Sequence, residues 1–312
     1  MIRQELGDEA LSARLSALPP DSILRFTLLN GTIRGALVSG SSLVASMRAQ
    51  HRLGILETLA LGQAYLAASL MSVTLKDGDR LTIRVDCTGV LKGFSVEAYW
   101  DGRLRGFLFA DNIVLDKPLE SFDLAPFIGK GTLSVSRLSP GGSPFTGHIE
   151  LVHGRIAEDI TEYFLRSEQI RTALVVSVKF DSSGRIAGAG GMFLQALPGA
   201  ADLDVSDAEA RLSDLPSLGD YFSRGFKCSD FLSQWFSTFE PNVMGSLPVG
   251  FVCDCNRERF TGYLAALPTS ELESMLQDGE DPTEIICHYC SSTYHFSKED
   301  LKTIIGKRPP KA

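Results

Sequence analysis

The chain has 312 residues, of which 44% are hydrophobic and 22% are charged, an ordinary composition for a globular protein. This length suggests two or three domains with enough material for a real hydrophobic core. The net charge of −8 argues against a nucleic-acid partner, because phosphate binding requires clustered lysines and arginines.

The first two-thirds of the chain predict a short extension followed by a mixed core. Residues 1–20 are expected to form an amphipathic extension that ends at Pro19-Pro20 and has no secretory signal. Strand-like segments then alternate with Gly- and Asp-rich turns at residues 23–29, 32–38, 80–85, 93–100, 132–138, 148–152 and 174–180. Residues 156–166 have helical spacing. We therefore expect an α+β core over residues 21–199, with a large, mostly antiparallel sheet and packed helices.

One segment of this core is apolar enough to be compared with a membrane span. Residues 58–75 carry no charge over 18 residues, close to the length that crosses a bilayer. Gly62 interrupts the segment, however, and Glu57 and Lys76 bracket it closely. A helix buried in a protein core has the same pattern, so no membrane contact is expected.

Residues 200–250 form an acidic segment rich in aromatic residues, with eight Asp or Glu against three Lys or Arg. Phe222 and Phe226 are four residues apart, as are Phe231 and Trp235, so two short helices each present an aromatic face. Helices this short are marginal in water and must pack on something else. We expect a metastable helical linker whose latch residues are these four aromatic side chains.

Residues 251–312 carry four of the six cysteines, as a C-x-C and a C-x-x-C pair: Cys253, Cys255, Cys287 and Cys290. Close pairs supply adjacent corners of a tetrahedron, and Zn²⁺ takes four thiolates in this way. A module of roughly 60 residues with few large apolar groups is difficult to fold alone, and a metal is a common remedy. The sequence predicts one structural Zn²⁺ per chain. Four cysteines at metal spacing also favour a reducing cytosol over disulfides.

Several other residues resemble site residues but are expected to have ordinary roles. His288 lies inside the C-x-x-C and His295 follows it, yet four cysteines already complete a site, so both are expected beside it or on the surface. Cys87 and Cys228 are expected to be small buried hydrophobes. The glycine run at residues 188–191 predicts a turn or strand, because no Lys-Ser/Thr follows it. No hydrolase motif is present, so no enzymatic activity is expected.

The cysteine segments closely resemble one known family. The segments CDCNRER (residues 253–259), LP (267–268) and CHYC (287–290) resemble the redox-switch domain of the heat-shock protein 33 family. The resemblance continues through EYFLRSEQ (162–169), GGMFLQ (190–195), RG (34–35) and TLK (74–76), and it spans about residues 24–305. The chain departs from the family in a longer N-terminal extension and in Cys87 and Cys228.

This resemblance implies a cytoplasmic holdase chaperone that works without ATP and responds to oxidants. The reduced form would hold zinc and be inactive. Oxidation would form the disulfides Cys253–Cys255 and Cys287–Cys290, release the metal, unfold the linker and expose a surface for clients. The implied partners are unfolding proteins and, on activation, a second copy of the chain, with neither nucleic acid nor membrane.

Two other functions remain open on the residues alone. A static zinc module could bind a protein or nucleic acid, although the acidic charge disfavours the latter. Cys287 and Cys290 could serve a thiol–disulfide oxidoreductase, but their motif does not open a helix after a strand, as thioredoxin-like chemistry requires.

Overall fold

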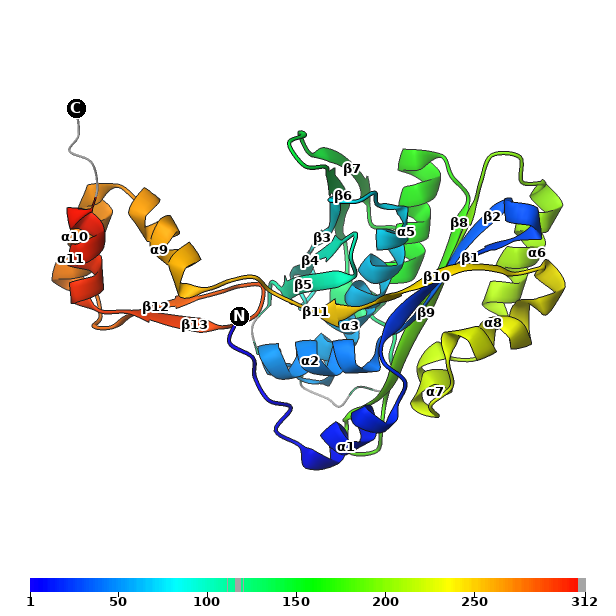
Figure 1. Ribbon diagram of the computed structural model, residues 1–312, viewed down its shortest axis with the longest axis horizontal. Coiled ribbons are helices and arrows are strands. Elements are labelled where there is room, and N and C mark those ends of the chain that lie inside the picture. Colours follow the sequence, from blue (N-terminus) through cyan, green and yellow to red (C-terminus); the bar gives the residue numbers. More distant parts are fainter. Residues whose placement is uncertain (111, 116–118, 120, 308–312) are drawn as a thin grey trace. The chain divides into compact units, whose positions relative to one another are not determined.

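The computed structural model describes residues 1–110, 112–115, 119 and 121–307. They form two compact units (Figure 1). The larger, here the core unit, comprises Glu5–Phe251. The smaller, here the cysteine unit, comprises Met1–Gln4 together with the chain from Val252 onward. The first four residues of the expected N-terminal extension therefore belong to the cysteine unit, and its helix α1 (Glu9–Ala17) belongs to the core unit.

The core unit is α+β, as expected, but its antiparallel strands are divided between two sheets rather than forming one. The five-stranded sheet has the order β10-β1-β2-β9-β8, with bounds Asn242–Pro248, Ser22–Leu28, Ile33–Ser39, Ile186–Ala196 and Thr172–Phe180. The six-stranded sheet has the order β11-β5-β4-β3-β6-β7, with bounds Gly250–Phe251, Arg103–Leu108, Gly93–Tyr99, Arg80–Cys87, Gly131–Leu138 and Phe145–Glu150. Among the strands that the structure describes, only the short β11 pairs in parallel, with β5.

Helix α3 (Ile55–Met71) packs against strands of both sheets and is buried on nearly every side (Figure 1). It accounts for the uncharged segment. Among the described residues, Ile55–Thr74 is the one helical stretch long and apolar enough to cross a membrane, and 89% of its most apolar window is buried inside the protein. The apolar surface of this helix is therefore used by the core. The remaining short elements before α5 are α2 (Ser41–His51) and α4 (Ala125–Ile128).

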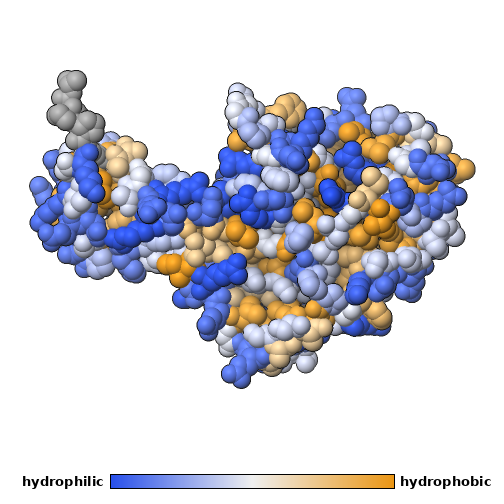
Figure 2. Space-filling view, in the orientation of Figure 1, coloured by the Kyte–Doolittle hydropathy of each residue, from blue (hydrophilic) through white to orange (hydrophobic). Residues whose placement is uncertain are grey.

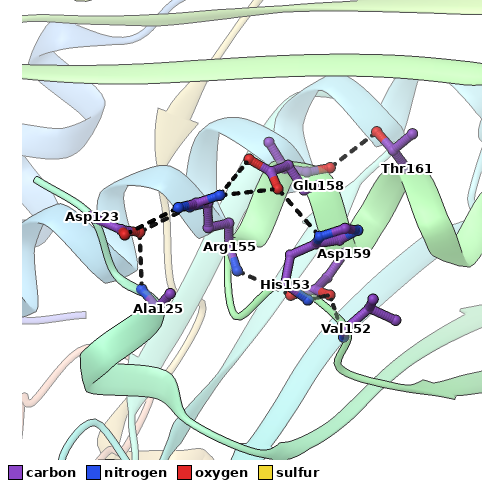
Figure 3. Close-up of polar contacts among 9 residues, drawn as sticks. Asp123, Ala125, Val152, His153, Arg155, Glu158, Asp159 and Thr161 are labelled. Carbon is purple, nitrogen blue, oxygen red and sulfur yellow. Dashed lines mark hydrogen bonds and ion pairs between the residues drawn. The ribbon is translucent and has the colours of Figure 1, made fainter.

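The start of helix α5 (Ile156–Tyr163) is fixed by a buried carboxylate (Figure 3). Asp159 is 2% exposed and accepts hydrogen bonds from the backbone N–H groups of Val152, His153 and Arg155 at 2.8, 2.9 and 3.1 Å. The Arg155 guanidinium in turn binds Asp123 at 2.9 and 3.1 Å. The helix does not continue regularly over 156–166 as expected, because residues 164–168 form a π-helical turn.

The linker segment packs on one face of the five-stranded sheet within the core unit. Its helices are α6 (Asp202–Ser213), α7 (Leu218–Ser223) and α8 (Cys228–Phe236), and they share a hydrophobic cluster with the sheet residues Leu37 and Met192. Phe222 and Phe231 are 1% and 0% exposed, whereas Phe226 is 44% exposed and Trp235 is half-buried. One of the four aromatic side chains therefore faces solvent.

The expectation of helix throughout residues 200–250 is wrong at its end. Residues 242–248 form β10, which pairs antiparallel with β1 from Asn242 to Pro248. Strand formation depends more on an available partner than on intrinsic preference, and β1 offers an open edge here.

The glycine run at residues 188–191 lies within β9, so the strand alternative is confirmed. A Cβ at Gly190 would lie 2.3 Å from the Phe222 ring, and one at Gly188 would lie 2.1 Å from the carbonyl oxygen of Gly219. The missing side chains therefore allow α7 to approach the sheet closely, and phosphate binding is not needed to explain them.

The cysteine unit is small, with the hairpin β12 (Thr283–Ile286) and β13 (Thr293–Phe296) and the helices α9 (Arg257–Ala266), α10 (Thr269–Asp278) and α11 (Lys298–Gly306). A capping box opens α11: Ser297 accepts from the Asp300 N–H, and Asp300 accepts from the Ser297 N–H. Its small core consists of the buried side chains of Leu264, Leu272, Tyr294, Phe296, Leu301 and Ile304.

The first prediction concerns pH. Burial raises the pKa of Asp21 to about 6, while its carboxylate accepts the Leu43 N–H at 2.6 Å at the start of α2. The folded state therefore binds a proton that the unfolded state has released between about pH 4 and 6, and stability falls as pH rises through that window. Relative to Asp21→Asn, the native protein should lose at most about 3 kcal/mol from pH 4 to pH 7.

Urea unfolding followed by tryptophan fluorescence at both pH values measures this difference. Both tryptophans, Trp100 and Trp235, lie in the core unit that contains Asp21. A stability difference between the two proteins that does not change with pH would show that Asp21 does not titrate in this range.

Candidate metal centre

The two cysteine pairs meet in the cysteine unit. Cys253 and Cys255 lie on the segment between β11 and α9, and Cys287 and Cys290 lie on the turn between β12 and β13. Their four sulfurs all lie within 4.8 Å of one another, and each residue is at most 6% exposed. We call this set the four-cysteine cluster.

The spacing of the sulfurs fits a tetrahedral metal site. The Cys253 and Cys287 sulfurs are 3.8 Å apart, and those of Cys255 and Cys290 are 3.3 Å apart. A tetrahedron with Zn–S bonds of about 2.3 Å separates its sulfurs by about 3.8 Å. A buried, closed set of four thiolates is the donor set that Zn²⁺ prefers in structural sites. The four-cysteine cluster could therefore hold Zn²⁺ without large rearrangement.

Local backbone hydrogen bonds explain how each pair points its sulfurs inward. The N–H groups of Cys290 and Ser291 donate to the Cys287 carbonyl at 3.2 and 2.7 Å, and the Cys287 N–H donates to the Ser292 carbonyl at 2.9 Å. Ser291 completes this tight turn with φ of 51°. On the other segment, Asn256 caps α9 by accepting the Arg259 N–H at 2.8 Å.

The cysteines of the cluster shift one another's pKa values. Hydrogen bonds from Cys287 and Cys290 lower the pKa of Cys253, because its thiolate is the one that the neighbouring thiols stabilise. The same interactions raise the pKa of Cys287, and hydrogen bonding with Cys253 raises the pKa of Cys290 to about 12. Cys253 therefore ionises more easily than Cys287 and Cys290, since thiolates a few ångströms apart repel one another. A divalent cation would offset that repulsion and favour four thiolates.

Two residues that the sequence reasoning missed border the sulfurs. The Tyr294 hydroxyl lies 3.2 Å from the Cys255 sulfur and donates to the Cys255 carbonyl at 3.0 Å. The Ser292 hydroxyl lies 3.2 Å from the Cys290 sulfur, accepts the Ile2 N–H at 3.0 Å and donates to the Ile2 carbonyl at 3.1 Å. The sequence marked these two residues only by their position, two and four residues after Cys290. Serine and tyrosine are too common for that position to identify them as site residues.

The other candidate residues lie outside the cluster. His288 and His295 are exposed, His295 Nδ1 is 3.4 Å from Glu284, and neither histidine belongs to the four-cysteine cluster. Cys228 is 7% exposed in the core unit, where burial raises its pKa to about 12 and makes its thiol unreactive. The expectation that Cys87 is buried is wrong, because it lies half-buried at the end of β3.

Comparison with known proteins gives a consistent result. The model of the family described as Hsp33 protein matches residues 21–297. A 33 kDa chaperonin of Desulforamulus reducens is 35% identical, with 92% of this chain and 98% of that protein covered. One of Ruminiclostridium cellulolyticum is 33% identical, with 91% and 98% covered. The crystal structure of the 33 kDa chaperonin of Thermotoga maritima, a heat shock protein 33 homolog, matches with a TM-score of 0.81 and 29% identity, covering 92% of this chain and 98% of that one.

The fold and these matches define the class of protein as a chaperone, which is not a class of enzyme. The chain belongs to the Hsp33 family, because the family model and its relatives cover nearly all of it. The resemblance seen in the cysteine segments is thereby confirmed.

The second prediction tests the metal. Protein purified under reductant should contain one zinc per chain, and replacing all four cysteines of the cluster by serine should abolish it. Because the cysteine unit has a small apolar core, chelation should also unfold it. Metal analysis measures the first effect, and protease digestion with and without a chelator measures the second.

Cys228→Ser is the matched control, since it removes a buried thiol of the core unit and should leave the zinc content at one per chain. Full zinc in the quadruple variant, or a cysteine unit that resists protease equally without metal, would contradict this assignment.

Proposed function

We propose that the protein is a redox-regulated holdase of the cytoplasm, inactive while zinc-bound and activated when oxidants remove the metal. The observation that supports this most strongly is the gathering of four sulfurs within 4.8 Å in a unit with little other core. Such a cluster is both the main support of its unit and its most oxidisable feature. Oxidation and unfolding are therefore one event.

The chemistry of the switch is balanced with peroxide as the oxidant. Two ligand thiolates lose two electrons and one S–S bond forms, while one peroxide takes up these two electrons and two protons from the solvent to give two waters. Repeating the step consumes all four ligands and releases zinc. A disulfide sulfur is a poor ligand for Zn²⁺, so the metal does not rebind until the bonds are reduced.

We propose that the bridges are Cys253–Cys255 and Cys287–Cys290. Distance within the folded cluster does not select a pairing, because all four sulfurs are neighbours. Selection follows once the metal leaves and the unit unfolds, when closing a short loop costs less chain entropy than closing a long one.

The linker segment is the proposed latch over the client surface. Its helices α6 to α8 bury Phe222 and Phe231 against the apolar face of the five-stranded sheet that carries Leu37 and Met192. Residues 242–251, which follow the latch and lead into the cysteine unit, are held to the core by β10, by the two-residue β11 and by the buried Phe251 ring, which lies against His51 and Tyr65. We propose that unfolding of the cysteine unit loosens this segment, and that the uncovered apolar face binds unfolding clients. On activation, two copies of the chain are proposed to associate.

The third prediction compares reduced and oxidised protein in one experiment. Light scattering of a heat-unfolding client should show suppression by the oxidised protein and none by the reduced protein, without ATP. Zinc release, read with a chromogenic chelator, should rise in parallel with suppression. Peptide mapping of the active protein should find both neighbour bridges and leave Cys87 and Cys228 reduced.

Other outcomes of that experiment would favour the alternatives. Equal suppression, or none, in both redox states would indicate a static zinc module. Catalytic reduction of insulin disulfides would indicate a thiol–disulfide oxidoreductase. Bridges mainly between the two pairs, such as Cys253–Cys287, would refute the proposed connectivity but not the switch.

The fourth prediction tests the latch. Replacing Phe231 and Trp235 by alanine removes a fully buried ring and the ring stacked on it at 6.1 Å. A buried Phe→Ala change alone costs about 3–5 kcal/mol, enough to loosen short helices. The double variant should therefore suppress client aggregation even when it is reduced and zinc-loaded, and protease should cut its linker faster.

The matched control is Phe226→Ala, which removes a linker aromatic side chain that is 44% exposed. That variant should stay inactive when reduced. If the double variant is as inactive as the parent and equally resistant to protease, the aromatic side chains are not the latch.

A further inference from the structure

The core unit contains a cavity of about 630 Å³ that the redox switch does not use. It lies where β2 and β9 meet the π-helical turn after α5. Six of its lining residues decide its chemistry: Arg34, Arg137, Phe164, Glu168, Arg171 and Gln195. We call it the arginine pocket.

Strand register builds the floor of the arginine pocket. Arg34 on β2 lies opposite Gln195 on β9, and Gln195 lies opposite Thr172 on β8, so the three residues form a row on one face of the sheet. Gln195 is 4% exposed and donates through its side-chain nitrogen to the Thr172 hydroxyl at 3.1 Å. This face is opposite to the one that the linker helices cover. Successive side chains of a strand point to opposite faces, and Arg34 and Gln195 are each three residues from Leu37 and Met192, which pack with the linker helices.

The wall is formed by an irregular segment. After Tyr163 the chain adopts a π-helical turn over Phe164–Glu168, and Gln169 follows with φ of 56°. Isolated π-helical turns and left-handed residues other than glycine are frequent at functional sites. The Phe164 ring packs edge-on against Phe193, 5.8 Å between centroids, which fixes one apolar side of the pocket.

The lining is positively charged, with three arginines against one glutamate. Arg137 is 2.8 Å from Glu168, and Arg171 binds Glu209 on α6 at 2.5 Å, so both are partly neutralised. Among the described residues, however, the Arg34 guanidinium has no hydrogen bond or ion pair, and the buried Nε of Arg137 has no hydrogen-bond partner. Unused donors of this kind, in a cavity with an apolar wall, are suited to a bound oxyanion.

A second observation comes from the sequence. Four segments that resemble the family lie outside the cysteine unit, and only residues 190–195 also contribute to the face that the linker covers, through Gly190 and Met192. All four reach this one cavity, through residues that lie far apart in the chain: Arg34, Thr74, Phe164, Glu168, Gln169 and Gln195.

We propose that the arginine pocket binds a small organic anion, with its carboxylate or phosphate group on Arg34 and its apolar part against Phe164. The volume supports an organic ligand, because a cavity of this size is typical of small-molecule sites and much larger than an inorganic ion. The site lies in the core unit, so it exists whether or not the redox switch works as proposed.

The fifth prediction is that the reduced, zinc-loaded protein binds a small organic anion saturably. Calorimetry with succinate and AMP distinguishes a carboxylate from a phosphate ligand, and inorganic phosphate is the ion-only arm. Arg34→Gln should weaken binding at least tenfold, since it removes the forked donor. Arg34→Lys keeps the positive charge but loses the forked donor, so its affinity should lie between those of the parent and of Arg34→Gln.

Arg25→Gln is the matched control, because Arg25 is an exposed arginine on the adjacent strand β1 and does not line the cavity. It should bind like the parent, and circular dichroism should show that all variants are folded. Two outcomes would overturn the proposal: no saturable binding of either organic probe up to about 10 mM, or equal binding by the Arg34→Gln variant. Binding of inorganic phosphate as tight as that of AMP would overturn the organic part of it.

Discussion

The main constraint on the cysteine unit is the crowding of four sulfurs within 4.8 Å of one another, because thiolates this close repel one another. Without a cation, Cys253 ionises more easily than Cys287 and Cys290, as the lowered pKa of Cys253 and the raised pKa values of the other two indicate. With a divalent cation, the same crowding would become a source of stability, because four metal–sulfur bonds would add to the small apolar core of the unit. We therefore expect the cysteine unit to be folded with a metal and unfolded without one.

The core unit differs from the cysteine unit, because its two sheets have more apolar surface than they can cover by themselves. One face of the five-stranded sheet is covered within the core by α3 and α5, and the other by the linker helices. The glycines of β9 show how closely this second cover fits, because Gly190 leaves room for the Phe222 ring. A cover that is complementary in shape but made of short helices is stable only while its ends are held.

The sequence predicted what depends on local spacing. The two cysteine pairs and most strands of the core are patterns within a few residues; the structure brings the pairs together and contains these strands. What could not be predicted depends on partners far along the chain. The division into two sheets, the strand at residues 242–248 and the row of Arg34, Gln195 and Thr172 all follow from register between distant segments. Register between distant strands cannot be predicted from a single sequence.

The balance of forces in the linker favours apolar packing over charge as the origin of the latch. Arg171 with Glu209 and Lys179 with Asp220 connect the sheet to α6 and α7, but their side chains are about one-third exposed or more, and such pairs contribute roughly 0–1 kcal/mol each. Burying one large aromatic side chain contributes about 1.5–3 kcal/mol, and the linker buries three, at Phe222, Phe231 and Phe236. The apolar term therefore dominates several-fold. If the linker opens as proposed, it would leave behind an apolar face, which is the kind of surface that an unfolding client requires.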